Sequence, residues 1–292
     1  MKSRMYDRIY YTVVYGLVAL AVIITLYPFI YVVSMSISAP EAVAAKEVFL
    51  WPKGFSTLAY ERVFQNPAIW RSLYNSVWYT VVATIANVVF TILGAYPLAR
   101  PRFFARKFFM AVFVFTMFFW GGLVPFFVIV NKLGLYNTRW ALVAPYLIET
   151  WNLVICRTFF QGMPEELYES AKIDGANELR ILWKITTPLS KQIIAILALF
   201  YGISNWNGWF GAVLLIANSK LHPLQVYLRN VLLAGSSAEA MMSWAQMGRA
   251  ALLSTLQLKY ALIVIASVPI ILVYPFVQRY FEKGVLLGSL KG

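Results

Sequence analysis

Residues 161–189 read QGMPEELYESAKIDGANELRILWKITTPL, a polar and charged segment between two long apolar segments. Pro164 suits the first position of a helix, and the two glutamates after it place negative charge at the positive end of the helix dipole. Gly175 is placed to end this helix, and a second short helix can begin near Asn177. The second helix is expected to carry four side chains on one face: Leu179, Leu182, Trp183 and Thr186. The sequence therefore predicts a helical hairpin with a glycine corner, which ends where Pro188 restarts the chain.

The composition around this hairpin is that of a membrane protein. The chain has 292 residues, of which 61% are hydrophobic and 13% charged, whereas about 25% of the residues of soluble domains are charged. Apolar runs that can supply the roughly 20 residues of a bilayer crossing predict six spans. These lie at 9–37, 72–99, 108–131, 140–160, 190–217 and 259–280. We expect an all-α polytopic membrane protein with a single domain over 1–292 and external loops at 39–71 and 217–258.

The distribution of Lys and Arg predicts the orientation of the chain. The compact turn RPRFFARK at 100–107 is the clearest positive-inside signal, and the hairpin at 161–189 lies on the same side. Both termini are then cytoplasmic. The first apolar run is too long for a secretory signal peptide and is expected to remain as a membrane anchor. Because the net charge of +13 sits at span ends rather than on one soluble face, the sequence argues against nucleic-acid binding.

The hairpin resembles the EAA loop of permease subunits in binding-protein-dependent ABC importers. The family pattern is Glu-Ala-Ala, three residues, Gly, nine residues, Ile, one residue, Leu-Pro. The matching residues are Glu169, Ser170, Ala171, Gly175, Ile185, Thr187 and Pro188. Ser170 replaces the first Ala and Thr187 replaces Leu, and both changes keep a small or medium side chain. The resemblance extends over nearly the whole chain, including GVLLGSLKG at 284–292, and is close to the maltose-type carbohydrate-uptake subclass.

The resemblance implies a type I ABC importer permease fold and a role in transport. In the family the loop couples the permease to a cytoplasmic ATPase, and small side chains at Ser170 and Ala171 would let the helix lie deep in a groove. The coupling residues implied here are Glu165, Glu166, Glu169, Ser170, Ala171, Asp174, Gly175, Ile185 and Pro188. The implied partners are a related second permease in a heterodimer, two ATPase subunits and an extracytoplasmic solute-binding protein.

Transport would then follow from alternating access. ATP and Mg would bind the ATPase subunits, and the chain itself would bind no cofactor. It would form half of the path for an oligosaccharide across the bacterial inner membrane, in contact with membrane lipid. The nearest permeases in the family carry oligosaccharides derived from polysaccharides, and alginate is one candidate substrate.

The sequence lacks the signals of an enzyme. It has no Gly-x-x-x-x-Gly-Lys-Ser/Thr phosphate loop, so ATP cannot be held in that way. The lone His222 has no Cys or second His with which to share a metal, and the single Cys156 lies in an apolar span. The glutamates of the hairpin have no visible companion base. We therefore expect a non-catalytic subunit without a metal site.

Polar and aromatic residues inside two spans are candidates for the substrate path. Glu149 with Trp151 and Asn152 is one group, because an acid within a span is costly and is by default suspected of a function. The second group is Asn205, Trp206, Asn207 and Trp209 in SNWNGWFG, since indoles stack on sugar rings and amides bond hydroxyls.

Structural roles remain open for both groups. Glu149 can instead pair with Arg157 or with another subunit, and the Trp-Asn cluster can be an interfacial belt with helix contacts. Asn75 and Asn87 are read as helix-packing amides. For the whole chain the alternatives are an ion-coupled secondary transporter, for which the sequence shows no inverted repeat or paired ion ligands, and a membrane scaffold that does not transport.

Overall fold

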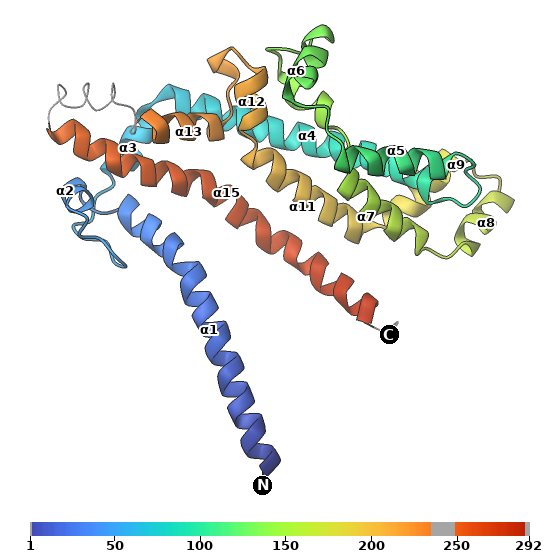
Figure 1. Cartoon of the computed structure of the whole chain (residues 1–292), viewed down its shortest axis with the longest axis horizontal. Coiled ribbons are helices and arrows are strands. Elements are labelled where there is room, and N and C mark those ends of the chain that lie inside the picture. Colours follow the sequence, from blue (N-terminus) through green and yellow to red (C-terminus); the bar gives the residue numbers. More distant parts are fainter. Residues whose placement is uncertain (1, 235–248, 290–292) are drawn as a thin grey trace. The chain divides into compact units, whose positions relative to one another are not determined.

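The computed structural model describes residues 2–234 and 249–289 (Figure 1). Within these residues every regular element is a helix, apart from one isolated β-bridge, so the predicted all-α class is confirmed. Two predicted segments lie partly outside the described residues: 235–248 of the external loop 217–258, and the last three residues of the tail at 284–292.

The chain divides into two compact units. Unit 1 comprises Met1–Trp70 and Leu228–Pro269, and unit 2 comprises Arg71–Tyr227 and Ile270–Gly292. The single domain and the six spans expected from the sequence stay predictions.

Unit 1 contains the first long apolar helix and the segment that follows it. Its elements are α1 (Lys2–Ser36), α2 (Pro40–Ala44), α3 (Leu58–Gln65) and the first part of α15 (Arg249–Ser289). The segment after α1 is held by Gln257, whose Nε2 donates to the carbonyl of Ser38 at 2.6 Å and to that of Ser36 at 3.3 Å. Ser38 also forms the isolated antiparallel bridge, with Phe55. These bonds fasten the segment between α1 and α3 to the start of α15.

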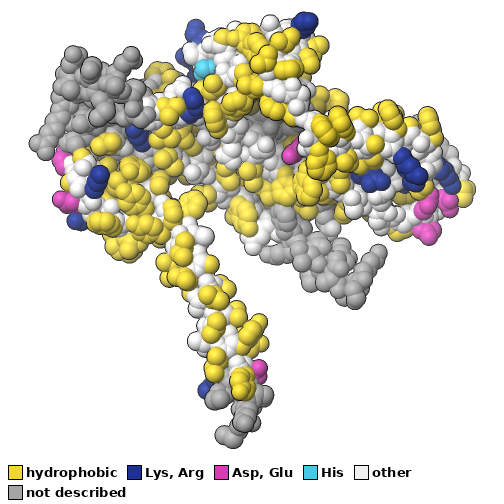
Figure 2. All heavy atoms as spheres, viewed as in Figure 1, with side chains coloured by type: hydrophobic (Ala, Val, Ile, Leu, Met, Phe, Trp, Pro, Cys, Tyr) yellow, Lys and Arg dark blue, Asp and Glu magenta, His cyan; other side chains and the backbone are white. Residues whose placement is uncertain are grey.

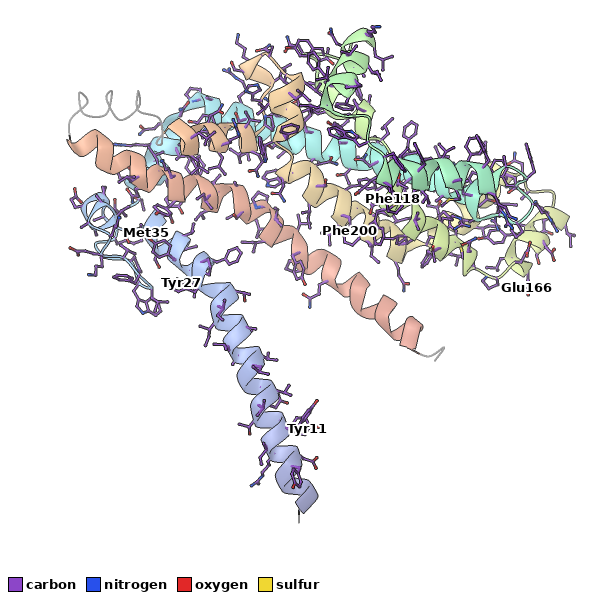
Figure 3. All side chains as sticks on the ribbon, viewed as in Figure 1. Tyr11, Tyr27, Met35, Phe118, Glu166 and Phe200 are labelled. Carbon is purple, nitrogen blue, oxygen red and sulfur yellow. The ribbon has the colours of Figure 1, made fainter. Side chains whose placement is uncertain are left out.

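The helix α1 has apolar side chains on every face. Its part Tyr6–Ser36 has a mean hydropathy of 2.4, and none of its most apolar stretch is buried. Figure 3 shows side chains projecting from all around this helix, with Tyr11 and Tyr27 labelled. A helix of this length that is apolar all round belongs in a membrane.

Although the start of α4 and most of α13 belong to unit 1, unit 2 holds both candidate sites, the last part of α15 and the remaining elements. In chain order they are α4 (Pro67–Ala99), α5 (Arg106–Phe118), α6 (Leu123–Lys132), η1 (Arg139–Leu142), η2 (Ala144–Tyr146), α7 (Thr150–Gln161), α8 (Glu166–Ile173), α9 (Glu178–Ile181), the π-helix η3 (Leu182–Thr186), α10 (Thr187–Leu189), α11 (Lys191–Asn207), α12 (Phe210–Leu215), η4 (Ser219–Leu221) and α13 (Leu224–Ala234). Figure 2 shows charged side chains gathered at the end of the unit that carries α8 and α9.

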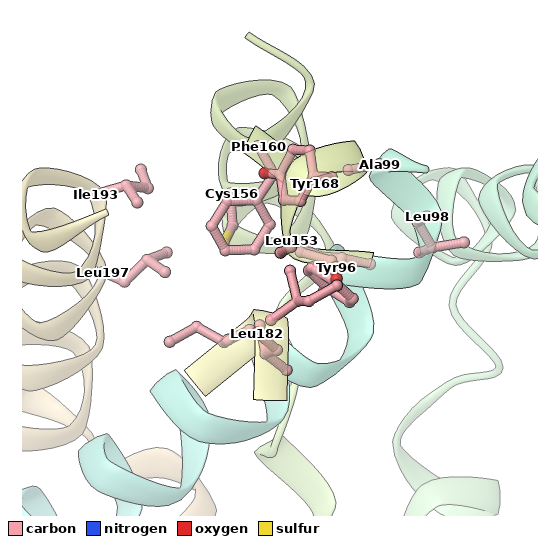
Figure 4. Close-up of a cluster of buried hydrophobic side chains, with 14 of the residues drawn as sticks. Tyr96, Leu98, Ala99, Leu153, Cys156, Phe160, Tyr168, Leu182, Ile193 and Leu197 are labelled. Carbon is pink, nitrogen blue, oxygen red and sulfur yellow. The ribbon is translucent and has the colours of Figure 1, made fainter. Parts of the chain in front are cut away.

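The main core of unit 2 lies beneath the hairpin. Buried side chains of α4, α7, α8 and α11 meet there with those of the short helices after the glycine corner (Figure 4). Leu153, Cys156, Ile181 and Leu197 are fully buried in this cluster. The free Cys156 therefore has a packing role, as its apolar surroundings in the sequence indicate.

By length and composition, three helices in the described part of the chain can cross a membrane: Tyr6–Ser36, Pro67–Ala99 and Leu256–Pro275. A fourth crossing is available if Glu178–Leu189 and Lys191–Asn207, which meet at 83°, are taken as one broken span. The predicted span at 190–217 is itself divided, because α11 ends at Asn207.

The predicted span at 108–131 is two helices rather than one. α5 ends at Phe118 and α6 begins at Leu123. Four residues separate them, of which the last two are glycines, and Gly122 adopts φ +92°, a conformation that side chains disfavour. Pro125 follows in the first turn of α6, where its missing N–H costs little. The glycine pair and the proline therefore interrupt the helix, although the sequence is apolar throughout the predicted span.

The predicted span at 140–160 is also interrupted. Two single 3-10 turns, η1 and η2, occupy its first part, and only α7 from Thr150 onwards is an α-helix. Pro145 lies within η2 and removes a backbone donor that a continuous helix would use. The chain thus enters α7 directly after Glu149.

Candidate functional site

The glycine corner of the hairpin is formed by a hydrogen-bonded helix end. The N–H of Ala176 donates to the carbonyl of Ala171 at 2.9 Å, and the N–H of Gly175 donates to that of Lys172 at 3.0 Å. This pair of bonds is the Schellman arrangement, which requires a left-handed residue, and Gly175 supplies it with φ +77°. The predicted corner is confirmed. The helix begins at Glu166, so Pro164 precedes it by two residues instead of occupying its first position.

The second helix begins where the sequence predicts. Asn177 is its N-cap, and the Oδ1 of this residue accepts from the N–H of Arg180 at 2.8 Å. The predicted face is wrong in part, since Leu179 is 63% exposed and Trp183 is 43% exposed. The buried side chains are Ile181, Leu182 and Thr186. The π-turn η3 changes the helical period from Leu182 onwards, whereas Leu179 and Ile181 already depart from the predicted face before it.

The inner face of α8 packs on the core of its own unit. Tyr168 and Ala171 are buried in the main cluster. Ala171 therefore does not face the surface that a groove on a partner would touch, and its small side chain allows α8 to approach the core. Of the two small residues, Ser170 is exposed, and the contact of this helix with a groove on a partner stays a prediction.

An arginine at the end of α4 fastens the hairpin to that helix. The guanidinium carbon of Arg100 lies 3.0 Å from the ring centroid of Tyr168 in α8 and 4.5 Å from that of Tyr96 in α4. Such cation–π contacts contribute about 0.5 to 2 kcal/mol each. We call Arg100, Tyr96 and Tyr168 the arginine clasp. It holds α8 and α4 together at the base of the hairpin.

Glu178 extends this connection across the glycine corner. Its carboxylate accepts from the Tyr96 hydroxyl at 2.7 Å and pairs with the Lys172 Nζ at 2.6 Å. The pKa of the Glu178 carboxyl is lowered: burial alone raises it, but hydrogen bonds from Lys172 and Tyr96 outweigh that effect. The carboxylate is thus charged at neutral pH and links both helices of the hairpin to α4.

Ile173 is the most exposed of the apolar side chains of the hairpin, and acidic residues lie near it in the sequence. Ile173, at the end of α8, is 87% exposed. Most of the predicted coupling residues are exposed: Glu165, Glu166, Glu169, Ser170, Asp174, Gly175 and Pro188. Ile185 is half-buried. Glu169 forms an exposed ion pair with Arg102 at 3.2 Å. The sequence reasoning did not single out Ile173, although an isoleucine beside a polar corner is a recognisable signal.

A cavity of about 690 Å³ lies elsewhere in unit 2. Polar and aromatic side chains line it: Tyr79, Asn87, Tyr146, Glu149, Tyr201, Ser204, Asn205, Asn207, Trp209 and Phe210. Four of the predicted path residues are among them, namely Glu149, Asn205, Asn207 and Trp209. Three are not. Trp206 is 5% exposed and Asn152 is buried, while Trp151 is exposed but does not line the cavity.

Glu149 stands at the N-terminus of α7, where the helix dipole favours a negative charge. Its Oε2 accepts from the Nδ2 of Asn152 at 2.7 Å, and its backbone N–H donates to the hydroxyl of Tyr201 at 3.1 Å. Arg157 instead donates from Nε to the carbonyl of Leu98 at 3.0 Å, and no ion pair joins it to Glu149. The pairing of these two residues, one of the readings left open by the sequence, is absent.

The amides of the cavity wall form a chain between helices. The Nδ2 of Asn205 donates to the Oδ1 of Asn87 at 3.0 Å and to the hydroxyl of Thr84 at 3.2 Å. Asn87 in turn donates to the carbonyl of Tyr146. Asn87 therefore packs helices, as predicted, and also lines the cavity, which was not predicted. Asn75 lies outside the cavity and bonds the carbonyls of Lys220 and His222.

The cavity adjoins the break between α11 and α12. Gly208 and Trp209 lie in this break, and both line the cavity. Gly211 allows a close approach, since a Cβ at this position would lie 3.1 Å from the Tyr146 hydroxyl oxygen. Non-helical backbone at membrane depth is tolerated where it lines a cavity. The break thus places aromatic faces, amides and backbone groups around one space.

The chemistry of this wall suits a polyhydroxylated ligand. Aromatic rings offer flat apolar faces, the amides donate and accept, and the volume is within the roughly 300 to 1,000 Å³ of small-molecule sites. Among the described residues that line it, Glu149 is charged and none is Lys or Arg. The sequence reasoning missed Tyr146 and Tyr201, although tyrosines inside apolar segments were a signal.

Metal chemistry finds no support in the described residues. No group of three or more His, Cys, Asp or Glu side chains there is close enough to hold a metal ion. His222 bonds through Nε2 to the carbonyl of Ile216 at 3.0 Å, which gives it a structural role in the loop before α13.

The chain is similar to a known protein family and to proteins of Bacillus subtilis. Residues 88–287 match the family described as binding-protein-dependent transport system inner membrane component. The polygalacturonan/rhamnogalacturonan transport system permease protein YtcP of Bacillus subtilis (strain 168) is 41% identical over 292 residues, which is 100% of both chains. Protein LplC of the same organism is 41% identical over 273 residues, or 92% of this chain and 90% of that protein.

The fold of the chain is similar to that of a solved structure. A chain in the crystal structure of a bacterial ABC transporter involved in the import of the acidic polysaccharide alginate matches with a TM-score of 0.86 and 36% identity. The match covers 94% of this chain and 98% of that one.

Proposed function

The chain belongs to the family of binding-protein-dependent transport system inner membrane components, and from this premise we propose that it forms half of the translocation path for an oligosaccharide in an ATP-driven importer. As a type I ABC importer permease it is an integral component of the bacterial inner membrane. We propose that the subunit is non-catalytic and that ATP and Mg are bound by its ATPase partners.

The observation that carries this proposal is the cavity at the break between α11 and α12. Trp209, Asn207 and Asn205 line it together with Glu149, and these residues come from different predicted spans. Stacking and amide hydrogen bonds hold a sugar without the strong charge pairing that would slow its release.

The hairpin supplies the second half of the proposal. Ile173 and the acidic residues around it form an exposed surface, while the arginine clasp holds α8 to α4. We propose that an ATPase subunit contacts this surface and that its movement reaches the spans through the clasp. Importers of this family work with an ATPase and a solute-binding protein, and we propose two ATPase subunits and a related second permease in a heterodimer.

The charge of the cavity indicates which groups of the substrate this chain contacts. The relatives named above include a permease of polygalacturonan/rhamnogalacturonan transport and a transporter involved in the import of the acidic polysaccharide alginate, and we propose an oligosaccharide derived from an acidic polysaccharide. Glu149 would repel a uronate carboxylate, and no lining cation compensates. We therefore propose that this chain contacts the uncharged hydroxyls and ring faces of the sugar, and that cations for its acid groups lie outside this cavity.

The test is sugar uptake by cells that express the chain with its partner subunits. Trp209→Ala and Asn207→Ala should lower the uptake of labelled oligosaccharide roughly tenfold, because each removes a cavity contact. Asn131→Ala in α6 is the matched control, since Asn131 is exposed and does not line the cavity. Assembly and basal ATP hydrolysis should be unchanged in all three variants.

The same experiment separates the alternatives. Uptake that persists after ATP depletion while ion gradients remain would identify an ion-coupled secondary transporter. A chain that assembles with its partners without any saccharide uptake would be a scaffold. Native uptake in both cavity variants would contradict the proposed path.

A further inference from the structure

Three of the five side chains that line a second cavity of unit 2 are cationic. It has a volume of about 360 Å³ and is formed by Arg106, Lys107, Met110, Arg157 and Gln161. The first three residues come from the start of α5 and the last two from the end of α7. We call it the basic pocket. Three positive charges meet there, and none of the lining residues is acidic.

Among the described residues, no ion pair involves a side chain that lines the basic pocket. In the described part of the chain the ion pairs are Lys53 with Glu47, Arg102 with Glu169 and Lys172 with Glu178. The Nε of Arg157 donates to the carbonyl of Leu98, and the two terminal nitrogens of its guanidinium can donate to another acceptor. Cations gathered without a carboxylate repel one another, so an anion would stabilise the pocket.

The surroundings of the pocket favour a lipid over a soluble anion as its ligand. Gln161 is the last residue of α7 and precedes the hairpin directly, so the pocket lies at the hairpin end of the unit. Exposed apolar side chains continue from Lys107 and Met110 along α5 at helical spacing, at Val114, Met117 and Phe118. Phe118 marks the far end of this stripe (Figure 3).

We propose that the basic pocket binds the phosphate of an anionic phospholipid, with an acyl chain lying along the stripe on α5. Guanidinium groups bind phosphate oxygens through paired hydrogen bonds, and basic pockets between membrane helices are suited to lipid headgroups. With the predicted orientation, the lipid belongs to the cytoplasmic leaflet. The occupied pocket would hold the start of α5 to the end of α7, immediately before the hairpin.

The test uses the complete transporter in nanodiscs of phosphatidylcholine with increasing fractions of phosphatidylglycerol. Native mass spectrometry counts the phosphatidylglycerol molecules retained by the complex. The double variant Arg106→Gln/Lys107→Gln should lose one retained lipid and weaken apparent binding by roughly ten- to thirtyfold, since each cation contributes about a few-fold in affinity. The charge-keeping variant Arg106→Lys/Lys107→Arg should retain the lipid.

A matched control removes the same charge elsewhere. Lys132→Gln/Lys220→Gln alters two lysines outside the basic pocket and should bind lipid as the native complex does. Equal retention by the pocket variant and the control, or an equal loss, would overturn the proposal. Excess inorganic phosphate should leave the lipid in place, and its full displacement would show a free-anion site instead.

Discussion

At the scale of single residues, Glu149 and Arg100 have opposite surroundings. Glu149 brings a carboxylate to the cavity, where none of the described lining residues is Lys or Arg, and its Oε2 accepts a hydrogen bond from Asn152. Arg100 is enclosed by two tyrosine rings beneath the hairpin. The first residue therefore affects which ligand is accepted, and the second affects how the hairpin is held.

Glu149→Gln should change substrate preference rather than stability. The amide can keep the contact with Asn152 but removes the repulsion of an acidic sugar. At about 8 Å and an effective dielectric near 40, this repulsion is roughly 1 kcal/mol, or about fivefold in uptake of an acidic relative to a neutral oligosaccharide. Competition between the two labelled sugars measures the ratio. An unchanged ratio with reduced thermal stability would assign Glu149 a structural role.

Arg100→Ala should loosen the hairpin. Loss of the two cation–π contacts is expected to cost about 1 to 3 kcal/mol, observed as a lower melting temperature and as ATP hydrolysis that no longer drives uptake. Arg102→Ala is the control, because it removes an exposed ion pair worth about 1 kcal/mol at most. Equal effects of the two changes would argue against the clasp.

At the scale of elements, the hairpin depends on one backbone conformation. Nothing lies within 4 Å of a Cβ placed on Gly175, so a side chain there has space. The cost of a substitution comes from φ +77° and not from a clash. The corner therefore depends on a backbone conformation rather than on the absence of a side chain.

Gly175→Leu should therefore weaken the corner by about 1 to 2 kcal/mol and lower sugar uptake per ATP hydrolysed. Gly175→Asn should be milder, because Asn tolerates the left-handed region. Uptake and ATP hydrolysis in proteoliposomes measure both. Native coupling in the Leu variant would show that this corner does not transmit the movement of the ATPase, and equal damage by Asn and Leu would point to a steric cause.

At the scale of the whole molecule, the orientation rests on the positive-inside rule. Cysteines at Ser170 in the hairpin and at Thr57 in the predicted external loop are both exposed, so a membrane-impermeant thiol reagent can reach them. The native Cys156 is buried and should not react. In intact spheroplasts the Thr57→Cys chain should react and the Ser170→Cys chain should not. The opposite pattern would reverse the orientation.

Local signals in the sequence were sufficient for the hairpin. Asn177 and Gly175 act within one turn of the chain, so their capping and corner roles follow from residue type alone. The interruption near Gly122 was missed, although two glycines and a proline marked it. Apolar continuity was given more weight there than backbone conformation.

The sequence by itself determined the helical class, the membrane composition and the hairpin, because hydropathy and capping are properties of neighbouring residues. Tertiary structure decided which side chains share a cavity. Glu149 lines the larger cavity with Asn205 and Asn207, whereas Trp206 does not. Arg157 bonds the carbonyl of Leu98 and lines the basic pocket. The physical reason is that a break such as Gly208 and a π-turn such as η3 rotate the residues after them, and packing of distant helices selects the rotation.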